Sequence, residues 1–180
     1  MGHSAGGLTA AEIEAFLRRL GECVQEPATL YLVGGSAMCL LGSPRRTLDI
    51  DYVGSDLPKP EDELATTIRS LAAELRLEVE GVPIDRFIAL PPGADSRHRL
   101  VGQFGNLAAY VFDPYSIAIS KIDRGFETDL QDVAFLTRAG FIALDELERF
   151  AGTTVQQARD YGIDPNEFRL HLAALKLLLG

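Results

Sequence analysis

The sequence is poor in the residues that build disulfide frameworks and zinc sites. Its 180 residues include two cysteines, three histidines and no tryptophan. Cys23 and Cys39 lie in apolar, helix-like surroundings, so we expect two small buried side chains and no disulfide. His3, His98 and His171 lack the spacing of zinc ligands. The chain is therefore expected to fold in a reducing compartment, the cytoplasm, without a disulfide or zinc framework.

Long apolar runs and an excess of basic residues are also missing. No stretch approaches the roughly 18 apolar residues of a membrane span, and the N-terminus does not read as a secretion signal, so we expect no membrane association. Lysine and arginine number 17 against 26 aspartates and glutamates, and the formal net charge is −9. This charge argues against a general nucleic-acid binder, but it permits a local basic rim around an acidic cleft.

Hydrophobic periodicity and capping signals predict an order of elements in which strands dominate the first two-thirds and helices the rest. Thr9 and Glu12 form a capping-box pattern at the start of the first helix, and Asp113-Pro114 starts another. The predicted strands cover residues 29–33, 48–53, a segment from 77, 84–90, 100–103 and 107–112. The predicted helices cover residues 9–23, 36–41, 60–75, 115–124, 129–138, 145–150 and 166–179.

Residues 33–53 combine a glycine pair and a serine with two aspartates. Gly34, Gly35 and Ser36 follow an apolar, β-type run, and Asp49 and Asp51 follow the next short helix. Glycines let backbone N–H groups approach a phosphate, and a helix N-terminus favours its negative charge. Alternation along a strand places both aspartates on one face, where two hard oxygen ligands can share a magnesium ion.

These linked motifs resemble the signature of the DNA polymerase β-like nucleotidyltransferase superfamily. The resemblance implies an α/β (α+β) fold, with a mixed β-sheet nucleotidyltransferase core, flanking helices and a helical C-terminal part. We expect the core to span residues 1–136, with about eight flexible residues at its start, and helices of residues 137–180 to pack on it. The resemblance also implies Mg²⁺ or Mn²⁺ at the aspartates and an NTP near the residues Gly34, Gly35, Ser36, Arg46, Thr47 and Asp129.

Superfamily members often carry a third carboxylate on a later strand. Asp85, near the start of the predicted strand 84–90, is the best match for a third metal ligand and catalytic acid beside Asp49 and Asp51. Glu80, which precedes Pro83, is the alternative.

A second block resembles abortive-infection-type nucleotidyltransferase toxins and related uncharacterised bacterial proteins. It runs from Asp113 to Lys121 and continues through Thr128, Asp129 and Asp132. The resemblance implies a catalytic role for Lys121, whose charge would neutralise part of a triphosphate. Asp129 and Asp132 lie one helical turn apart, and either is expected to orient Lys121 or the acceptor. Thr128 departs from the pattern, since a basic residue is common there.

The resulting hypothesis is a nucleotidyltransferase that moves an NMP from an NTP to a macromolecule. The expected acceptor is the 3′ end of tRNA or a protein hydroxyl, and a toxin role would imply an antitoxin partner. Two alternatives remain open. One is a catalytically inactive nucleotide-binding or protein-interaction module, and the other is a small-molecule enzyme similar to the aminoglycoside nucleotidyltransferases.

Overall fold

The computed structural model describes residues 6–55 and 61–180, and the chain divides into two compact units. The sheet unit comprises residues up to Pro83 together with Arg99–Phe112, and the helical unit comprises Ile84–His98 and Asp113–Gly180. The sequence predicted a core of residues 1–136 with the helices of residues 137–180 packed on it; in the structure, residues 113–136 belong to the same compact unit as the later helices. The reason is that the helices between residues 113 and 138 pack on the later helices.

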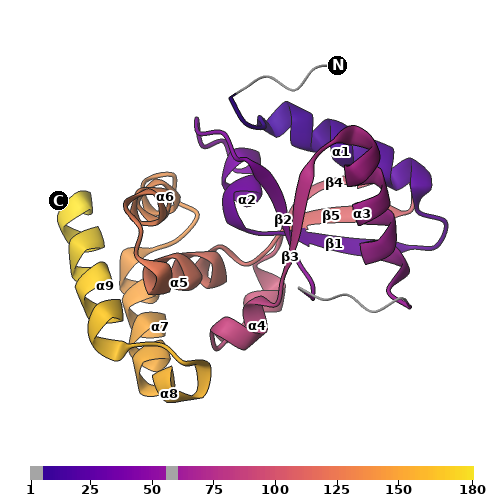
Figure 1. The fold of residues 1–180 in the computed structure, drawn as a ribbon. Helices are drawn as coiled ribbons and strands as arrows, with labels where there is room; N and C mark the ends of the chain where they lie inside the picture. Colours follow the sequence, from indigo (N-terminus) through magenta and orange to yellow (C-terminus); the bar gives the residue numbers. More distant parts are fainter. Residues whose placement is uncertain (1–5, 56–60) are drawn as a thin grey trace. The chain divides into compact units, whose positions relative to one another are not determined.

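The sheet unit is built on a five-stranded sheet (Figure 1), and the sheet is mixed, as the sequence predicted. The strand order is β3-β2-β1-β5-β4, with β1 parallel to β5, β2 parallel to β3, and the pairs β1–β2 and β4–β5 antiparallel. The strands are β1 (Ala28–Leu32), β2 (Asp49–Val53), β3 (Glu78–Val82), β4 (Arg99–Phe104) and β5 (Leu107–Val111). The parallel pair β2–β3 is joined by a crossover that contains a helix, which is the usual connection between parallel strands.

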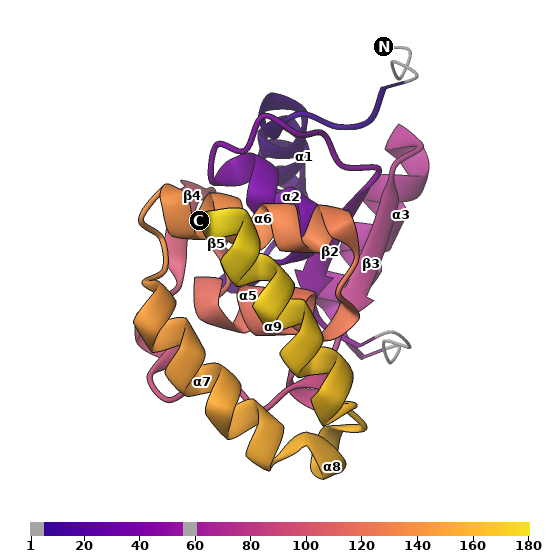
Figure 2. The same ribbon diagram turned by 90° about the vertical axis from the view of Figure 1, so that its left-hand side faces the viewer.

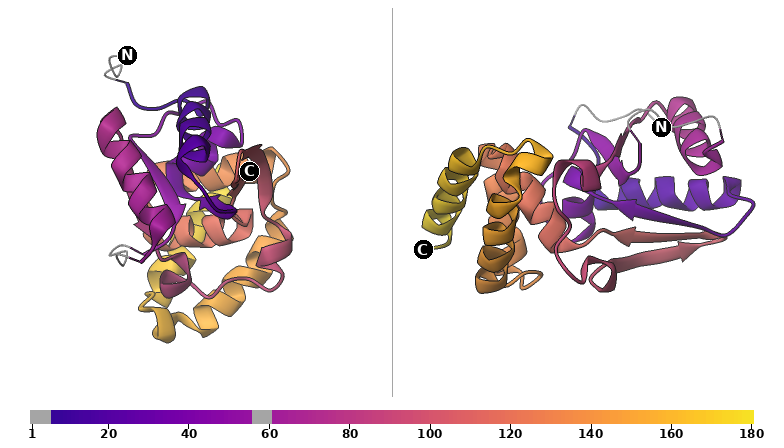
Figure 3. Two further views of the ribbon diagram at one scale, coloured as in Figure 1. Left: turned by 90° about the vertical axis from the view of Figure 1, so that its right-hand side faces the viewer. Right: turned by 90° about the horizontal axis from the view of Figure 1, so that it is seen from below.

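Helices α1 (Ala10–Cys23) and α3 (Glu63–Leu75) cover one face of this sheet (Figures 1 and 3). The capping box predicted for Thr9 and Glu12 is present at the start of α1. Apolar residues at helical spacing, among them Phe16 and Ile68, pack against alternate strand residues such as Leu32 and Ile50. This core leaves the other side chains of each strand, at the intervening positions, on the opposite face of the sheet.

The first residues that the structure describes are held in place. Leu8 is buried and forms an antiparallel bridge with Thr47, which precedes β2. The flexibility predicted for the first eight residues therefore does not extend to Leu8, and residues 1–5 lie outside the described part of the chain.

The helical unit contains all four helices predicted for the second half of the sequence. Helix α9 lies across α5 and α6, and α7 also packs on α5 (Figure 2). The helices with the predicted positions are α5 (Pro114–Arg124), α6 (Glu127–Arg138), α7 (Leu144–Gln156) and α9 (Pro165–Leu179). The short helices α4 (Ile84–Phe87), η1 (Ala94–Ser96) and α8 (Ala158–Tyr161) were not predicted. Within the described residues, no helix combines the length and the apolar character needed to cross a membrane.

Two sequence predictions are wrong in detail. The strand predicted for residues 84–90 is a helical turn, α4, because the buried residues Ile84 and Ile88 are four positions apart. That spacing fits one turn of a helix, and Pro83 suits its start. Of the two cysteines, Cys39 is buried as expected but Cys23 is exposed, and both are free thiols.

A buried ion pair fixes the start of α5 within the helical unit. The fully buried carboxylate of Asp113 accepts hydrogen bonds from the backbone N–H groups of Tyr115 and Ser116. Arg97 donates to both of its oxygens at 2.7 and 3.0 Å, and this hydrogen bonding raises the pKa of Arg97. The guanidinium also lies over the rings of Tyr115 and Phe150. One arginine thus joins the segment before β4 to α5 and α7.

Replacing Asp113 with alanine is expected to lower the free energy of unfolding by about 3–5 kcal/mol, because it removes a helix cap and one partner of a buried ion pair. Urea denaturation checks this value. Asp95→Ala is the control, since the Asp95 side chain is fully exposed, and it should leave the stability unchanged within the error of the measurement. Equal effects of the two substitutions would contradict a stabilising role for the pair.

Candidate active site

Three carboxylates meet where β2 and β3 run side by side. Asp49 and Asp51 alternate with Ile50 along β2, and the parallel register pairs Asp51 with Glu80 on β3. One carboxylate oxygen from each of the three acids lies within 4.8 Å of the others. We call Asp49, Asp51 and Glu80 the carboxylate cluster.

The strand alternation sets the orientation of the cluster. Ile50 and Tyr52 point into the core beneath α1 and α3, and this burial raises the pKa of the Tyr52 phenol. The neighbouring positions, Asp49 and Asp51, lie on the opposite face and are partly exposed, while Glu80 is exposed. The acids therefore stay hydrated although the strand behind them is apolar.

The glycine pair at the start of α2 (Gly34–Leu40) lies directly against Asp51. Gly34 has φ of +57°, and a Cβ atom there would overlap the Asp51 carboxylate. The N–H of Gly35 donates to Asp51 Oδ2 at 3.2 Å. Both the backbone conformation and the close approach thus require glycine at position 34, which is the physical reason for the motif.

Ser36 stabilises this turn from inside. Its side chain is fully buried, and its hydroxyl lies 2.9 Å from the carbonyl oxygen of Val33 and 3.1 Å from that of Asp51. The hydroxyl therefore connects α2 to β2. The sequence predicted a phosphate contact for Ser36, and in this structure the hydroxyl faces backbone carbonyls instead.

Arg46 and Thr47, predicted to lie near the nucleotide, occupy different environments. Arg46 is exposed and donates to the carbonyl oxygen of Gly7 at 2.9 Å. Thr47 is only 4% exposed, and its hydroxyl donates to Asp49 Oδ1 at 3.1 Å. Thr47 thus contacts one acid of the cluster directly.

The cluster has the chemistry of a site for a hard divalent cation. Its ligand atoms are all carboxylate oxygens, which Mg²⁺ and Mn²⁺ prefer. Three like charges this close repel one another unless a cation or hydrogen-bond donors compensate them. Thr47 and Gly35 each donate one hydrogen bond to an aspartate, and a divalent ion would supply positive charge to balance the three carboxylates.

The third carboxylate of the cluster is Glu80, the alternative that the sequence left open, and not Asp85. Asp85 lies beyond the end of β3, exposed on α4 in the helical unit. A signal for Glu80 was present in the sequence, because Glu78-Val79-Glu80 repeats the acid-apolar-acid pattern of Asp49-Ile50-Asp51. Glu80 lies close to the two aspartates only because of the register in which β3 pairs with β2.

Lys121, Asp129 and Asp132 are brought together within the helical unit. Lys121 is 3% exposed, and its Nζ lies 3.1 Å from Asp129 Oδ1 and 2.7 Å from Asp132 Oδ2. Arg124 also pairs with Asp129 at 2.6 Å. Two cations and two carboxylates thus compensate one another. Both aspartates orient the Lys121 ammonium, a role that the sequence had proposed for either of them.

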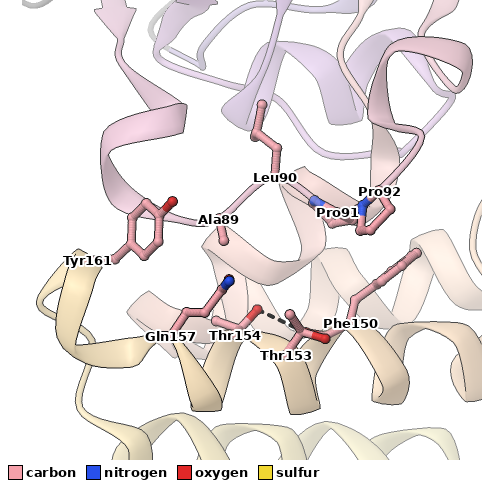
Figure 4. A pocket seen from close by; sticks show the side chains of 9 residues that line it. All are labelled: Ala89, Leu90, Pro91, Pro92, Phe150, Thr153, Thr154, Gln157 and Tyr161. Atoms are coloured by element: carbon pink, nitrogen blue, oxygen red, sulfur yellow. Dashed lines mark hydrogen bonds between the residues drawn. The ribbon is translucent and has the colours of Figure 1, made fainter.

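The helical unit also contains a pocket of about 230 Å³ (Figure 4). None of its lining side chains is charged, and the hydroxyls of Thr153 and Thr154 bond to carbonyls of their own helix. Phe150, Gln157 and Tyr161 supply its larger walls. A triphosphate requires cations, so this pocket lacks the groups for nucleotidyl transfer.

Gly34→Ala is expected to lower the free energy of unfolding by about 2–4 kcal/mol, because it combines an unfavourable positive φ with overlap of the Asp51 carboxylate. Gly42→Ala is a matched control, since Gly42 also has a positive φ but a Cβ atom added there would meet no other atom within 4 Å. The control should lose only about 1 kcal/mol. Urea denaturation of both variants checks the difference, and equal losses would contradict the close contact.

Lys121→Met is expected to lower the free energy of unfolding by about 3–5 kcal/mol, because two buried carboxylates would lose their shared cation. Lys176→Met is the control: Lys176 pairs with Glu148 at a half-exposed position, where the expected loss is below about 1 kcal/mol. Thermal and urea unfolding measure both effects. A Lys121 variant as stable as the control would show that the pairing adds little to the fold.

Similarity to known proteins is found at the level of a family. A family model described as a nucleotidyltransferase of unknown function (DUF6036) matches residues 11–169. Neither the curated proteins nor the solved structures contain a significant match. The matched range includes the carboxylate cluster, the glycine pair and the Lys121 network. The chain therefore belongs to this family of nucleotidyltransferases.

Proposed function

We propose that the protein is a divalent-metal-dependent enzyme that transfers an NMP from an NTP to a hydroxyl group of a macromolecule. The observation that carries this proposal is the carboxylate cluster, in which three acids from two strands lie within 4.8 Å of one another. Family membership supports nucleotidyl transfer as the reaction class. The all-oxygen donor set supports Mg²⁺ or Mn²⁺ as the cofactor.

In this reaction an acceptor oxygen forms a bond to the α-phosphorus of the NTP. The bond from that phosphorus to the bridging oxygen breaks, pyrophosphate leaves, and the acceptor hydroxyl loses its proton. A divalent ion, when bound, stabilises negative charge on the phosphate oxygens. The barrier is dominated by charge and alignment, so the chain's main task is to position acidic and basic groups before the substrate arrives.

The acids, the glycine pair and Lys121 each have a task in this proposal. Asp49 and Asp51 hold the metal, and Glu80 completes the acidic set in place of Asp85. Gly34 and Gly35 lie directly against Asp51 and Thr47, and the Gly35 N–H donates to Asp51 Oδ2, which holds this carboxylate in the acidic set. The resemblance to nucleotidyltransferase toxins gives Lys121 a phosphate-neutralising role, and within the helical unit Asp129 and Asp132 orient its ammonium.

The acceptor is proposed to be the 3′ end of tRNA or a protein hydroxyl. This part of the proposal rests on the resemblance of residues 113–133 to nucleotidyltransferase toxins. A toxin role, with an antitoxin protein as partner, belongs to the same proposal. The acceptor therefore has to be identified by direct labelling.

The test is label transfer from each α-³²P-NTP, with Mg²⁺ or Mn²⁺, to total tRNA, to lysate protein and to aminoglycosides. Asp49→Asn, Asp51→Asn and Glu80→Gln are expected to lower transfer by about 100-fold or more, because each removes a proposed metal ligand. Asp85→Asn is the matched control and should retain activity. Label in tRNA or protein that depends on the three acids would support the proposal.

Other outcomes separate the alternatives. Label found only in aminoglycosides would indicate a small-molecule enzyme. Metal-dependent NTP binding without release of pyrophosphate under any condition would indicate an inactive nucleotide-binding module. Loss of activity in Asp85→Asn but not in Glu80→Gln would overturn the choice of Glu80.

A further inference from the structure

Thr47 occupies a distinctive position next to the carboxylate cluster. Its hydroxyl donates to Asp49 Oδ1 at 3.1 Å, and the residue is 4% exposed. On its other side the hydroxyl packs so closely on the Gly35 backbone that a Cβ atom there would overlap it. Thr47 therefore lies between the glycine turn and the acid of β2.

The backbone of Thr47 is fixed from the N-terminal side of the chain. Leu8 N–H donates to the Thr47 carbonyl at 2.6 Å, and Thr47 N–H donates to the Leu8 carbonyl at 3.1 Å. The buried Leu8 immediately precedes Thr9, the cap of α1. Because both backbone groups are paired, the hydroxyl is held at one place relative to β2.

This arrangement opposes the repulsion within the cluster. Asp49 and Asp51 are two anions on one face of a short strand, and mutual repulsion favours side-chain rotamers that separate them. A donor on each carboxylate reduces the repulsion and restricts the rotamers. Gly35 N–H supplies the donor for Asp51, and Thr47 supplies it for Asp49.

We infer that Thr47 is a positioning residue that holds Asp49 in the metal-binding orientation, and that it acts through this carboxylate and not by contact with the nucleotide. The inference rests on the proposed function, since it assigns Asp49 to a divalent ion. Neighbours that hydrogen-bond metal ligands fix ligand orientation, and their loss commonly weakens metal binding by about 10–100-fold.

The test measures Mn²⁺ binding to the purified protein from the loss of the free-ion signal in electron paramagnetic resonance. Thr47→Val keeps the shape but removes the hydroxyl, and is expected to raise the Kd for Mn²⁺ about tenfold. Thr47→Ser keeps the hydroxyl and should bind Mn²⁺ much as the wild type does. Thr154→Val is the matched control, because Thr154 is also buried and its hydroxyl donates to a backbone carbonyl.

A second readout separates positioning from nucleotide contact. In transfer assays at subsaturating Mn²⁺, Thr47→Val should lower the rate, and excess Mn²⁺ should restore it with the KM for NTP unchanged. A raised KM for NTP at saturating Mn²⁺ would overturn the inference in favour of direct nucleotide contact.

The remaining outcomes distinguish the two proposals. If the wild type binds Mn²⁺ with Asp51 as a ligand, and Thr47→Val binds Mn²⁺ with the same Kd, the role of Thr47 is overturned. The proposed function would then still stand. A wild type that binds no Mn²⁺ would overturn the metal site itself, and the inference with it.

Discussion

The parallel pairing of β2 with β3 is the constraint on which the candidate site depends. This register places Glu80 beside Asp51, so an acid of one strand joins the acids of the other. The pairing in turn requires the crossover helix α3, whose apolar face packs on the same core as Ile50 and Tyr52. Because Ile50 and Tyr52 are buried on one face of the sheet, the acids at the alternate positions lie together on the other face.

Concentrated negative charge has to be compensated by its surroundings, and the sheet unit does this with local donors. The Gly35 N–H and the Thr47 hydroxyl each donate to one aspartate. Ser36 and the Leu8 bridge hold the two segments that carry these donors. The glycine turn and the segment before β2 therefore act as one support for the aspartates, which explains why small and hydroxyl side chains surround them.

The helical unit compensates its charges differently. Lys121 and Arg124 are paired with Asp129 and, for Lys121, also with Asp132. Arg97 is paired with the buried Asp113 and lies against two aromatic rings. Such buried pairs tolerate little change at either partner, because the remaining charge would be left without its counterpart. The polar residues of this unit thus specify how its helices pack.

Local patterns in the sequence determined the caps of α1 and α5, the mixed α/β class and the placement of Asp49 and Asp51 on one strand face. These features follow from spacing within a few residues, where backbone geometry leaves little choice. The tertiary structure alone decided that Glu80 joins the aspartates, that Thr47 donates to Asp49 and that Lys121 is buried between Asp129 and Asp132. Strand register and side-chain pairing depend on how whole strands and helices pack against one another, and that packing is decided by the whole core.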